Sequence, residues 1–176
     1  RPEGESRPMM ARPLATDPRL WPQREALKAA LQYPGIAGSV FDSLPVECFT
    51  EPAYAAVREA MTALGGTSSG LDGAGWVDAV RTTVDDQSIE PLVTELAVEG
   101  MPVDEDNIPR YISGVLARLQ EVWVGAQIAD IKSRLRRMAP GEDPDGYNAV
   151  FGDLVALEAY RRSLLEQAVG PVVEAG

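Results

Sequence analysis

PRYISGVLARLQEVWVGAQIADIKSRLRRM, residues 109–138, is the stretch that decides the fold. It predicts one helix, because its thirty residues contain a single proline, in the first turn, and only two isolated glycines. At ~1.5 Å per residue this helix is roughly 45 Å long, which is more than the width of a small domain. The rest of the chain must therefore pack against different parts of it.

Two apolar stripes run along this helix. The first holds Ile108, Tyr111, Ile112, Val115, Leu119 and Val122, widened by Leu116 and Trp123. The second holds Val124, Ile128, Ile131, Leu135 and Met138. At ~100° per residue the second stripe lies about 160° around the helix from the first. We therefore expect the first half to pack in a bundle and the second half to project from it and pair with the C-terminal segment.

Short helical patterns precede the long helix, and none of the segments alternates with the two-residue period of a strand. Helices are expected from Asp17-Pro18 to just before Pro34, from Ile36 to Leu44, from Pro52 to Gly65, from Trp76 to Val84 and from Ser88 to Gly100. Short helices with short connections, closed by the first half of a long helix, predict a compact all-α bundle.

The C-terminal part is predicted to be a helical hairpin. The turn APGEDPDG, residues 139–146, reverses the chain, and the return helix runs from Tyr147 to Val169. The apolar residues of this helix spread over about 180°, which is wider than one neighbouring helix covers. They are Tyr147, Val150, Phe151, Leu154, Val155, Leu157, Leu164, Leu165 and Val169. Either the hairpin folds back on the bundle, or one edge of this face binds another protein.

The domain organisation follows from these patterns. We expect a flexible linker at 1–16, a helical bundle at 17–122, a helical hairpin at 123–169 and a tail at 170–176. No signal peptide and no apolar run near ~20 residues is present, so a soluble cytoplasmic protein without membrane contact is expected. Cys48, the only cysteine, is interpreted as a small buried hydrophobe.

The composition excludes several kinds of chemistry. Histidine is absent, which rules out Ser-His-Asp, Cys-His and His-based zinc sites. The net charge of −11 argues against direct nucleic-acid binding by the chain as a whole. Acidic clusters at 85–86, 104–106 and 142–145 lie at turns or helix starts, where solvated carboxylates are ordinary, so no catalytic residue, metal site or cofactor is predicted. A carboxylate enzyme with a bound metal is the alternative from another class.

The return helix carries the predicted partner-binding surface. Aromatic, leucine and arginine side chains in a buried patch supply most of the binding energy in many protein interfaces. The candidate residues are Tyr147, Phe151, Leu154, Val155, Leu157, Tyr160, Arg161, Leu164 and Leu165, with Arg134 and Arg137 of the long helix. The basic residues form either ion pairs within the hairpin on a solvated face or a polar rim that steers an acidic partner.

Four segments carry a resemblance to a known family. They are LWPQREALKAALQYPGIAGSVFDSL (20–44), FTEPAYAAVREAM (49–61), IPRYISGVLARLQEVWVGAQIADIKSRLRRM (108–138) and YNAVFGDLVALEAYRRSLL (147–165). Together they resemble the C-terminal helicase-binding domain of bacterial DnaG-type primases. The Ala-, Gly- and Val-rich composition resembles that of actinobacterial members, in particular mycobacterial ones. The resemblance covers about residues 17–169 and rests on extended similarity, because this domain has no short catalytic signature.

The resemblance implies an adapter function. In that family a bundle followed by a hairpin tethers primase to the hexameric DnaB-type helicase and couples primer synthesis to unwinding at the fork. In some members the same region also receives the acidic tail of single-stranded-DNA-binding protein. The zinc and magnesium sites of the parent primase lie in domains outside this sequence, so this part is not expected to be an enzyme. The isolated chain is expected to be a monomer, and a scaffold that self-associates through the return helix is the alternative.

Overall fold

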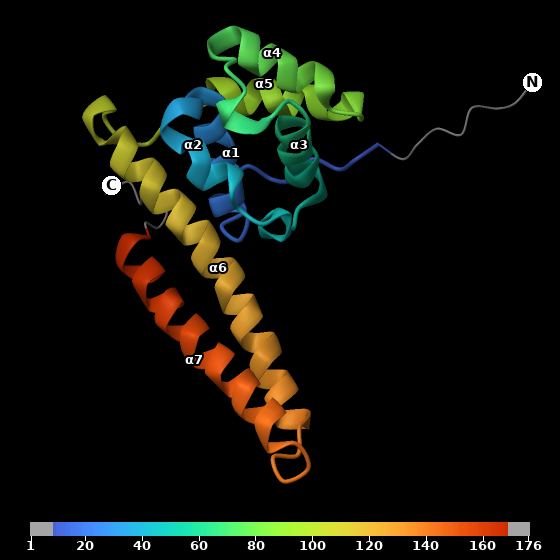
Figure 1. Cartoon of the computed structure of the whole chain (residues 1–176). Coiled ribbons are helices and arrows are strands. Elements are labelled where there is room, and N and C mark those ends of the chain that lie inside the picture. The colour runs from blue at the N-terminus through green and yellow to red at the C-terminus, as the bar shows by residue number, and fades with distance from the viewer. Residues whose placement is uncertain (1–8, 169–176) are drawn as a thin grey trace, which may run out of the picture.

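The computed structural model describes residues 9–168, which are all-helical and contain no strand, as predicted. The α-helices are α1 (Trp21–Gln32), α2 (Pro34–Asp42), α3 (Pro52–Ala63), α4 (Gly73–Thr83), α5 (Glu90–Val98), α6 (Ile108–Arg137) and α7 (Pro144–Gln167). Short 3-10 turns lie between them at η1 (Val46–Cys48), η2 (Gly66–Ser68), η3 (Gln87–Ile89) and η4 (Glu105–Asn107). The helices form a bundle from which α6 and α7 project as a hairpin (Figure 1).

Several helix starts differ from the prediction: α4 begins at Gly73, three residues before the predicted Trp76, and α2 begins at Pro34, two residues before Ile36. The starts of α1 and α7 differ because of the residues that precede them. The Asp17 carboxylate accepts the backbone N–H of Arg19 at 2.9 Å, so it forms a turn and α1 begins only at Trp21. The α7 helix begins at Pro144, three residues before the predicted Tyr147. Asp143 caps this start by accepting the backbone N–H of Gly146 at 3.0 Å. The last residue predicted for this helix, Val169, lies outside the described residues.

The bundle is organised around α1, in which every residue from Pro22 to Leu31 is buried. The helix lies among α2, α3, α5 and the first half of α6. From α4 the fully buried Trp76 reaches α1, where its indole N–H donates to the carbonyl oxygen of Ala30 at 2.9 Å. Cys48 is also in this core, as predicted, and burial raises the pKa of its thiol to about 12.

The buried face of α1 also carries charged residues that the apolar pattern did not reveal. Glu25 accepts hydrogen bonds from Lys28 at 2.8 Å and from the Tyr111 hydroxyl at 2.7 Å. Arg24 donates to Glu95 of α5 at 2.6 Å. Burial and the neighbouring Glu25 carboxylate raise the pKa of Tyr111. Because a buried charge is tolerated only when it is paired, this network fixes α1 relative to α5 and α6.

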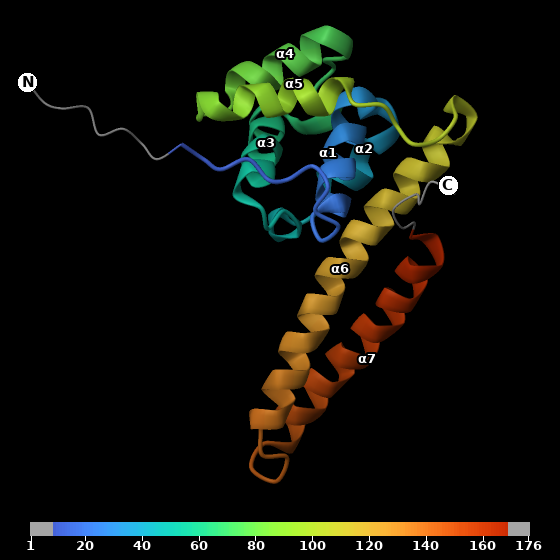
Figure 2. The ribbon, with the colours of Figure 1, turned by 180° about the vertical axis from the view of Figure 1, so that it is seen from behind.

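The long helix changes its partner along its length. The predicted first stripe, Ile108, Tyr111, Ile112, Val115 and Leu119, is buried in the bundle core. Val122 was predicted in the same stripe but is 52% exposed, because it borders a hollow of about 130 Å³ between α6 and the bundle. Trp123 packs against both the bundle core and the hairpin core. Seen from behind, α7 runs from the hairpin tip back towards the bundle (Figure 2). It lies alongside the distal part of α6 and apart from most of the bundle.

Part of the predicted linker lies on the bundle. Residues 9–16 form no helix, but Met10 packs against the core and its backbone N–H donates to Asp86 at 3.1 Å. Arg12 forms an ion pair with Glu95. Residues 1–8 and 169–176, which include the rest of the predicted linker and the tail, lie outside the described residues. The division into 17–122 and 123–169 stays a prediction.

Candidate functional site

The hairpin has a small hydrophobic core of its own. Its buried residues are Ala117, Val124, Ile128, Leu154 and Leu164, with Ile131, Leu135, Leu157 and Ala168 partly buried around them. The predicted second stripe of α6 therefore does face α7, except that Met138 lies past the end of the helix and outside this core. One face of α7 is used entirely by this intramolecular contact.

The candidate residues of α7 separate into two groups. Leu154 and Leu164 are buried against α6 and Leu157 is partly buried, as is Tyr147 at the start of the helix. A partner reaches Leu154 and Leu164 only if the hairpin opens. The other candidates, Phe151, Val155, Tyr160 and Leu165, remain about half exposed.

Three exposed candidates form one strip, which we call the apolar edge. Phe151, Val155 and Leu165 are 49%, 53% and 47% exposed. At ~100° per residue they fall within about 80° of one another, whereas Tyr160 lies roughly 180° from Phe151. The apolar edge is thus the part of the predicted face that α6 leaves uncovered, and Tyr160 belongs to the other side of the helix.

Arg161 lies in a clamp that closes the hairpin. Its Nε donates to Oε1 of Glu121 at 3.0 Å, and a terminal guanidinium nitrogen forms an ion pair with the same oxygen at 2.9 Å. Glu121 is 5% exposed and also accepts from Arg118 at 3.1 Å. A Cβ added at Gly125 would lie 3.4 Å from the guanidinium carbon of Arg161, so the glycine lets this side chain lie across α6. Contact of Arg161 with a partner stays a prediction.

The sequence pattern does not predict Glu121 or Gly125 as site residues. Glu121 lies between the two apolar stripes of α6, and Gly125 is one of the two isolated glycines of this helix. Their use becomes visible only when the register of α6 against α7 is known, because Arg161 is 40 residues away from Glu121.

A hollow lies beside the apolar edge. It measures about 210 Å³ and is bounded by Ile128 and Leu165 together with charged side chains. Lys132 and Glu158 form an ion pair of 3.2 Å across it, with both side chains about half exposed. At ~100° per residue Glu158 and Arg162 lie on the same side of α7 between Val155 and Leu165, so polar groups interrupt the apolar edge as well as flank it.

The basic end of α6 stands free at the tip of the hairpin. Arg134 and Arg137 are exposed, and neither forms an ion pair with another described residue. Residues 118–168 hold seven basic and eight acidic side chains, whereas residues 9–117 hold seven basic and sixteen acidic ones. The hairpin is therefore nearly neutral and the bundle strongly acidic.

The described residues contain neither a cluster of metal ligands nor a membrane span. Among residues 9–168 no group of three or more Cys, Asp or Glu side chains is placed to hold a metal ion. None of the described helices is long and apolar enough to cross a membrane.

Comparison with known proteins identifies the family. The family model described as "DNA primase DnaG DnaB-binding" matches residues 23–150. The chain belongs to this family. The match extends from α1 of the bundle into the first turns of α7, so it covers both parts of the fold.

Relatives of this DnaB-binding domain are DNA primases. The chain is 62% identical to the DNA primase of Mycobacterium tuberculosis over 162 residues, 62% to that of Mycolicibacterium smegmatis over 164, and 35% to that of Streptomyces coelicolor over 183. These alignments cover 92–94% of the chain but only 25–27% of each relative. The chain thus spans about a quarter of the length of these primases, and the resemblance predicted from its sequence is confirmed.

A solved structure shares the fold. The helicase binding domain of primase from Mycobacterium tuberculosis is 64% identical, with a TM-score of 0.75. The superposition covers 85% of this chain and 92% of that domain. The arrangement of bundle and hairpin is therefore that of a helicase-binding domain of primase.

Proposed function

We propose that this domain tethers a DNA primase to a hexameric DnaB-type helicase, in the cytoplasm at the replication fork, and thereby couples primer synthesis to unwinding. The docking surface is the apolar edge of α7, formed by Phe151, Val155 and Leu165. The domain itself contributes binding and no catalysis.

The exposure of the apolar edge is the observation that supports this proposal. Three large apolar side chains, each about half exposed, lie along one side of a helix whose adjacent side is already buried against α6. Aromatic and aliphatic side chains placed in this way gain about 25 cal/mol for each Å² of apolar surface that a partner covers. The family is named for DnaB binding, which gives the partner.

The charges around the apolar edge support orientation of the partner. Lys132, Glu158 and Arg162 border it, and Arg134 and Arg137 stand at the hairpin tip. Such rim charges act mainly on the association rate and on the choice of partner. An acidic patch on the helicase would be attracted to the arginines of the tip.

The proposal is tested by titrating the helicase with the unmodified chain and with the double variant Phe151→Ser/Val155→Ser and comparing the two binding constants. Both side chains are about half exposed, so the fold is retained, and we expect binding to weaken at least about tenfold. The matched control is Ile36→Ser/Val40→Ser, which has the same four-residue spacing and similar exposure, 45% and 50%, on α2. Equal losses in the two variants would contradict a docking surface on α7.

The same variants distinguish two alternative functions from helicase binding. If the apolar edge pairs two copies of the chain, sedimentation of the unmodified protein shows a dimer and the α7 double variant a monomer. If the acidic tail of single-stranded-DNA-binding protein docks here, the exposed Arg134 and Arg137 offer its carboxylates the guanidinium groups they require. A peptide of that tail would then compete with the helicase, and the variant Arg134→Glu/Arg137→Glu would not bind it.

A further inference from the structure

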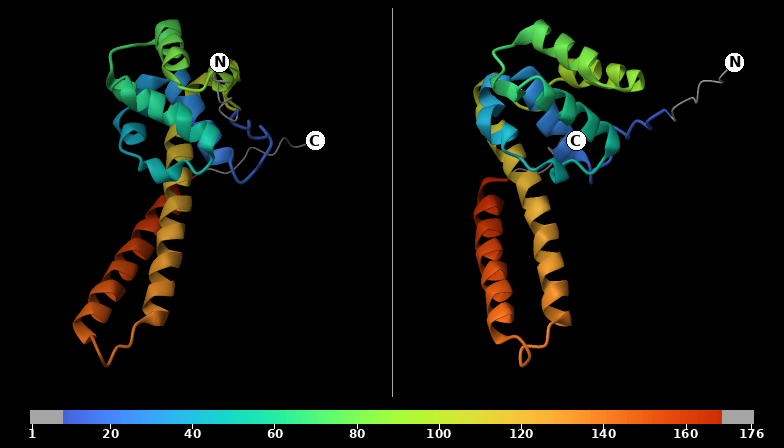
Figure 3. Two further views of the ribbon diagram at one scale, coloured as in Figure 1. Left: turned by 90° about the vertical axis from the view of Figure 1, so that its right-hand side faces the viewer. Right: turned by 45° about the vertical axis from the view of Figure 1, so that its right-hand side comes forward.

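The bundle carries a groove at the end opposite the hairpin. The helices α4 and α5 pack side by side there, far from the turn that joins α6 and α7 (Figure 3). The groove between them measures about 630 Å³, and the C-terminal end of α1 contributes to its lining. This volume is within the range of ~300–1,000 Å³ that is usual for binding pockets.

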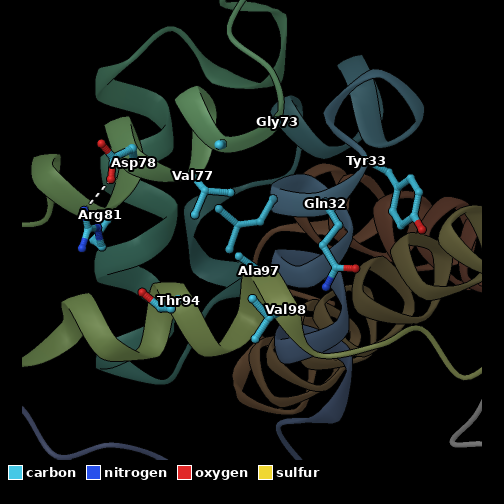
Figure 4. Close-up of a pocket in the computed structure, with 11 residues that line it drawn as sticks. Gln32, Tyr33, Gly73, Val77, Asp78, Arg81, Thr94, Ala97 and Val98 are labelled. Carbon is cyan, nitrogen blue, oxygen red and sulfur yellow. Dashed lines mark hydrogen bonds and ion pairs between the residues drawn. The ribbon is translucent and has the colours of Figure 1, made fainter.

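The middle of the groove is apolar. Val77 of α4 and Ala97 of α5 face each other there, and Val98, which is 76% exposed, forms part of the rim (Figure 4). Gly73 leaves space at one side, since a Cβ added to it would meet no atom within 4 Å. The groove therefore has room for apolar side chains of a ligand.

Apart from Tyr33, the polar side chains that line the groove are already engaged with one another or with the backbone. Asp78 and Arg81 form an ion pair at one end of the groove. At the other end the Gln32 amide donates to the carbonyl oxygens of Leu96 at 2.8 Å and Glu99 at 2.7 Å. Recognition of a ligand in the groove thus rests on its apolar centre and on the charges around it.

Those surrounding charges are strongly acidic. Residues 72–99, which hold both helices, contain seven Asp or Glu side chains, of which Asp78, Glu95 and Glu99 form ion pairs. Asp72, next to the lining residue Gly73, and Glu90, one helical turn before the lining residue Thr94, form no ion pair with any described residue. The field of this end of the bundle therefore attracts cations and repels an acidic peptide.

We propose that the groove between α4 and α5 docks a cationic amphipathic helix of another protein. The apolar face of that helix enters between Val77 and Ala97, and its Lys and Arg residues lie over Asp72 and Glu90. An amphipathic helix in an apolar groove is a recurrent mode of peptide recognition. Because this surface and the apolar edge lie at opposite ends of the molecule, both are available to partners at the same time, and the groove does not depend on the function proposed for the hairpin.

The experiment uses the whole chain and three synthetic peptides of about 18 residues. One has Leu at the positions of a helical stripe and Lys elsewhere, one has the same Leu positions with Glu, and one has Lys with Ser in place of Leu. Calorimetric titration near physiological salt is combined with amide NMR spectra. We expect the Lys/Leu peptide to bind at least about tenfold more tightly than the other two and to shift the amide signals of Val77, Ala97 and Val98.

Two variants test whether the peptide binds in the groove. Val98→Arg adds a positive charge at the rim and is expected to weaken binding of the Lys/Leu peptide about tenfold. The matched control Val46→Arg adds the same charge on η1, where Val46 is 57% exposed, and is expected to change binding little. Ala97→Trp fills the groove without changing its charge and is expected to abolish binding while the helical circular dichroism is retained. Equal effects of Val98→Arg and Val46→Arg, or equal binding of the Lys/Leu and Lys/Ser peptides, would mean unspecific charge attraction and would overturn the proposal.

Discussion

The bundle and the hairpin bury their apolar residues to very different extents. Among residues 9–168 the bundle core contains 28 buried residues from all of its α-helices, whereas the hairpin core contains five. Isolated helix pairs are marginally stable in water, so the hairpin depends on its attachment through α6 and on its few polar clamps. The part of the molecule with the thinnest core is also the part that leaves large apolar side chains exposed, as expected of a surface completed by a partner.

The largest effect should come from the bundle core. Replacing Trp76 by Ala removes a fully buried indole and its hydrogen bond to Ala30, and we expect it to lower the free energy of unfolding by about 3–5 kcal/mol. Urea unfolding followed by circular dichroism measures this. The control, Trp21→Ala, removes a partly buried side chain from the start of α1 and should have a clearly smaller effect. If the two losses are alike, the bundle does not depend on its core as described.

An intermediate effect is expected from the clamp of the hairpin. Glu121→Ala leaves Arg161 and Arg118 without their shared carboxylate, and we expect it to destabilise the contact of α7 with α6 by about 1–2 kcal/mol. Since the Arg161 side chain is 43% exposed, water compensates part of the loss. Hydrogen exchange should become roughly tenfold faster in α7 and remain unchanged in α1.

The exposed pair of the hairpin provides the comparison for this clamp. Glu158→Ala breaks the ion pair between Glu158 and Lys132, in which both side chains are about half exposed. The free energy of opening that hydrogen exchange reports for α7 is expected to change by less than ~0.5 kcal/mol. A double-mutant cycle of Glu121→Ala with Arg161→Leu isolates the coupling of the clamp. A coupling near zero would show that apolar contacts alone close the hairpin.

The same contrast explains what the sequence could predict. The reversal of the apolar stripe along α6 follows from helical periodicity, so the bundle and hairpin were predictable from residues such as Val115 and Ile128. The prediction that Val122 is buried was wrong, because helical periodicity does not show which part of an apolar stripe the neighbouring elements cover. Arg24 and Glu25 look like ordinary solvated residues in the sequence, since the side chains that pair with them from α5 and α6 are 71 to 86 positions away.

The candidate site shows a similar limit. The excess width of the apolar face of α7 was predictable, because it needs only the helical period. Which edge of that face is covered depends on the register against α6, and this register places Leu154 inside and Phe151 outside. The pairing of Arg161 with Glu121 depends on the same register, so a residue predicted to meet a partner also closes the hairpin.

The smallest effect concerns the segment that lies on the bundle at residues 9–16. Hydrogen bonds from Ser88 and from the Met10 backbone lower the pKa of Asp86, and the hydrogen bond from Arg24 lowers the pKa of Glu95, which also pairs with Arg12. A carboxyl group with a lowered pKa in the folded protein stabilises the fold above its ordinary pKa near 4 and loses this contribution as the pH falls through the lowered value. The segment should therefore stay attached from pH 8 to about 5 and be released below about 4. The chain has no histidine whose titration would interrupt that plateau.

The amide NMR signal of Met10 reports this release directly, because its N–H donates to the Asp86 carboxylate. In Asp86→Asn the signal should lose its acid transition, whereas Asp85→Asn, at the exposed neighbouring position, should keep it. The core signals of Trp76 should not move over the same range, since its indole is bonded to a backbone carbonyl that does not titrate. A transition of Met10 that persists in Asp86→Asn would place the acid-sensitive contact elsewhere, at the Arg12 and Glu95 pair, and the double change Asp86→Asn/Glu95→Gln would then be needed to abolish it.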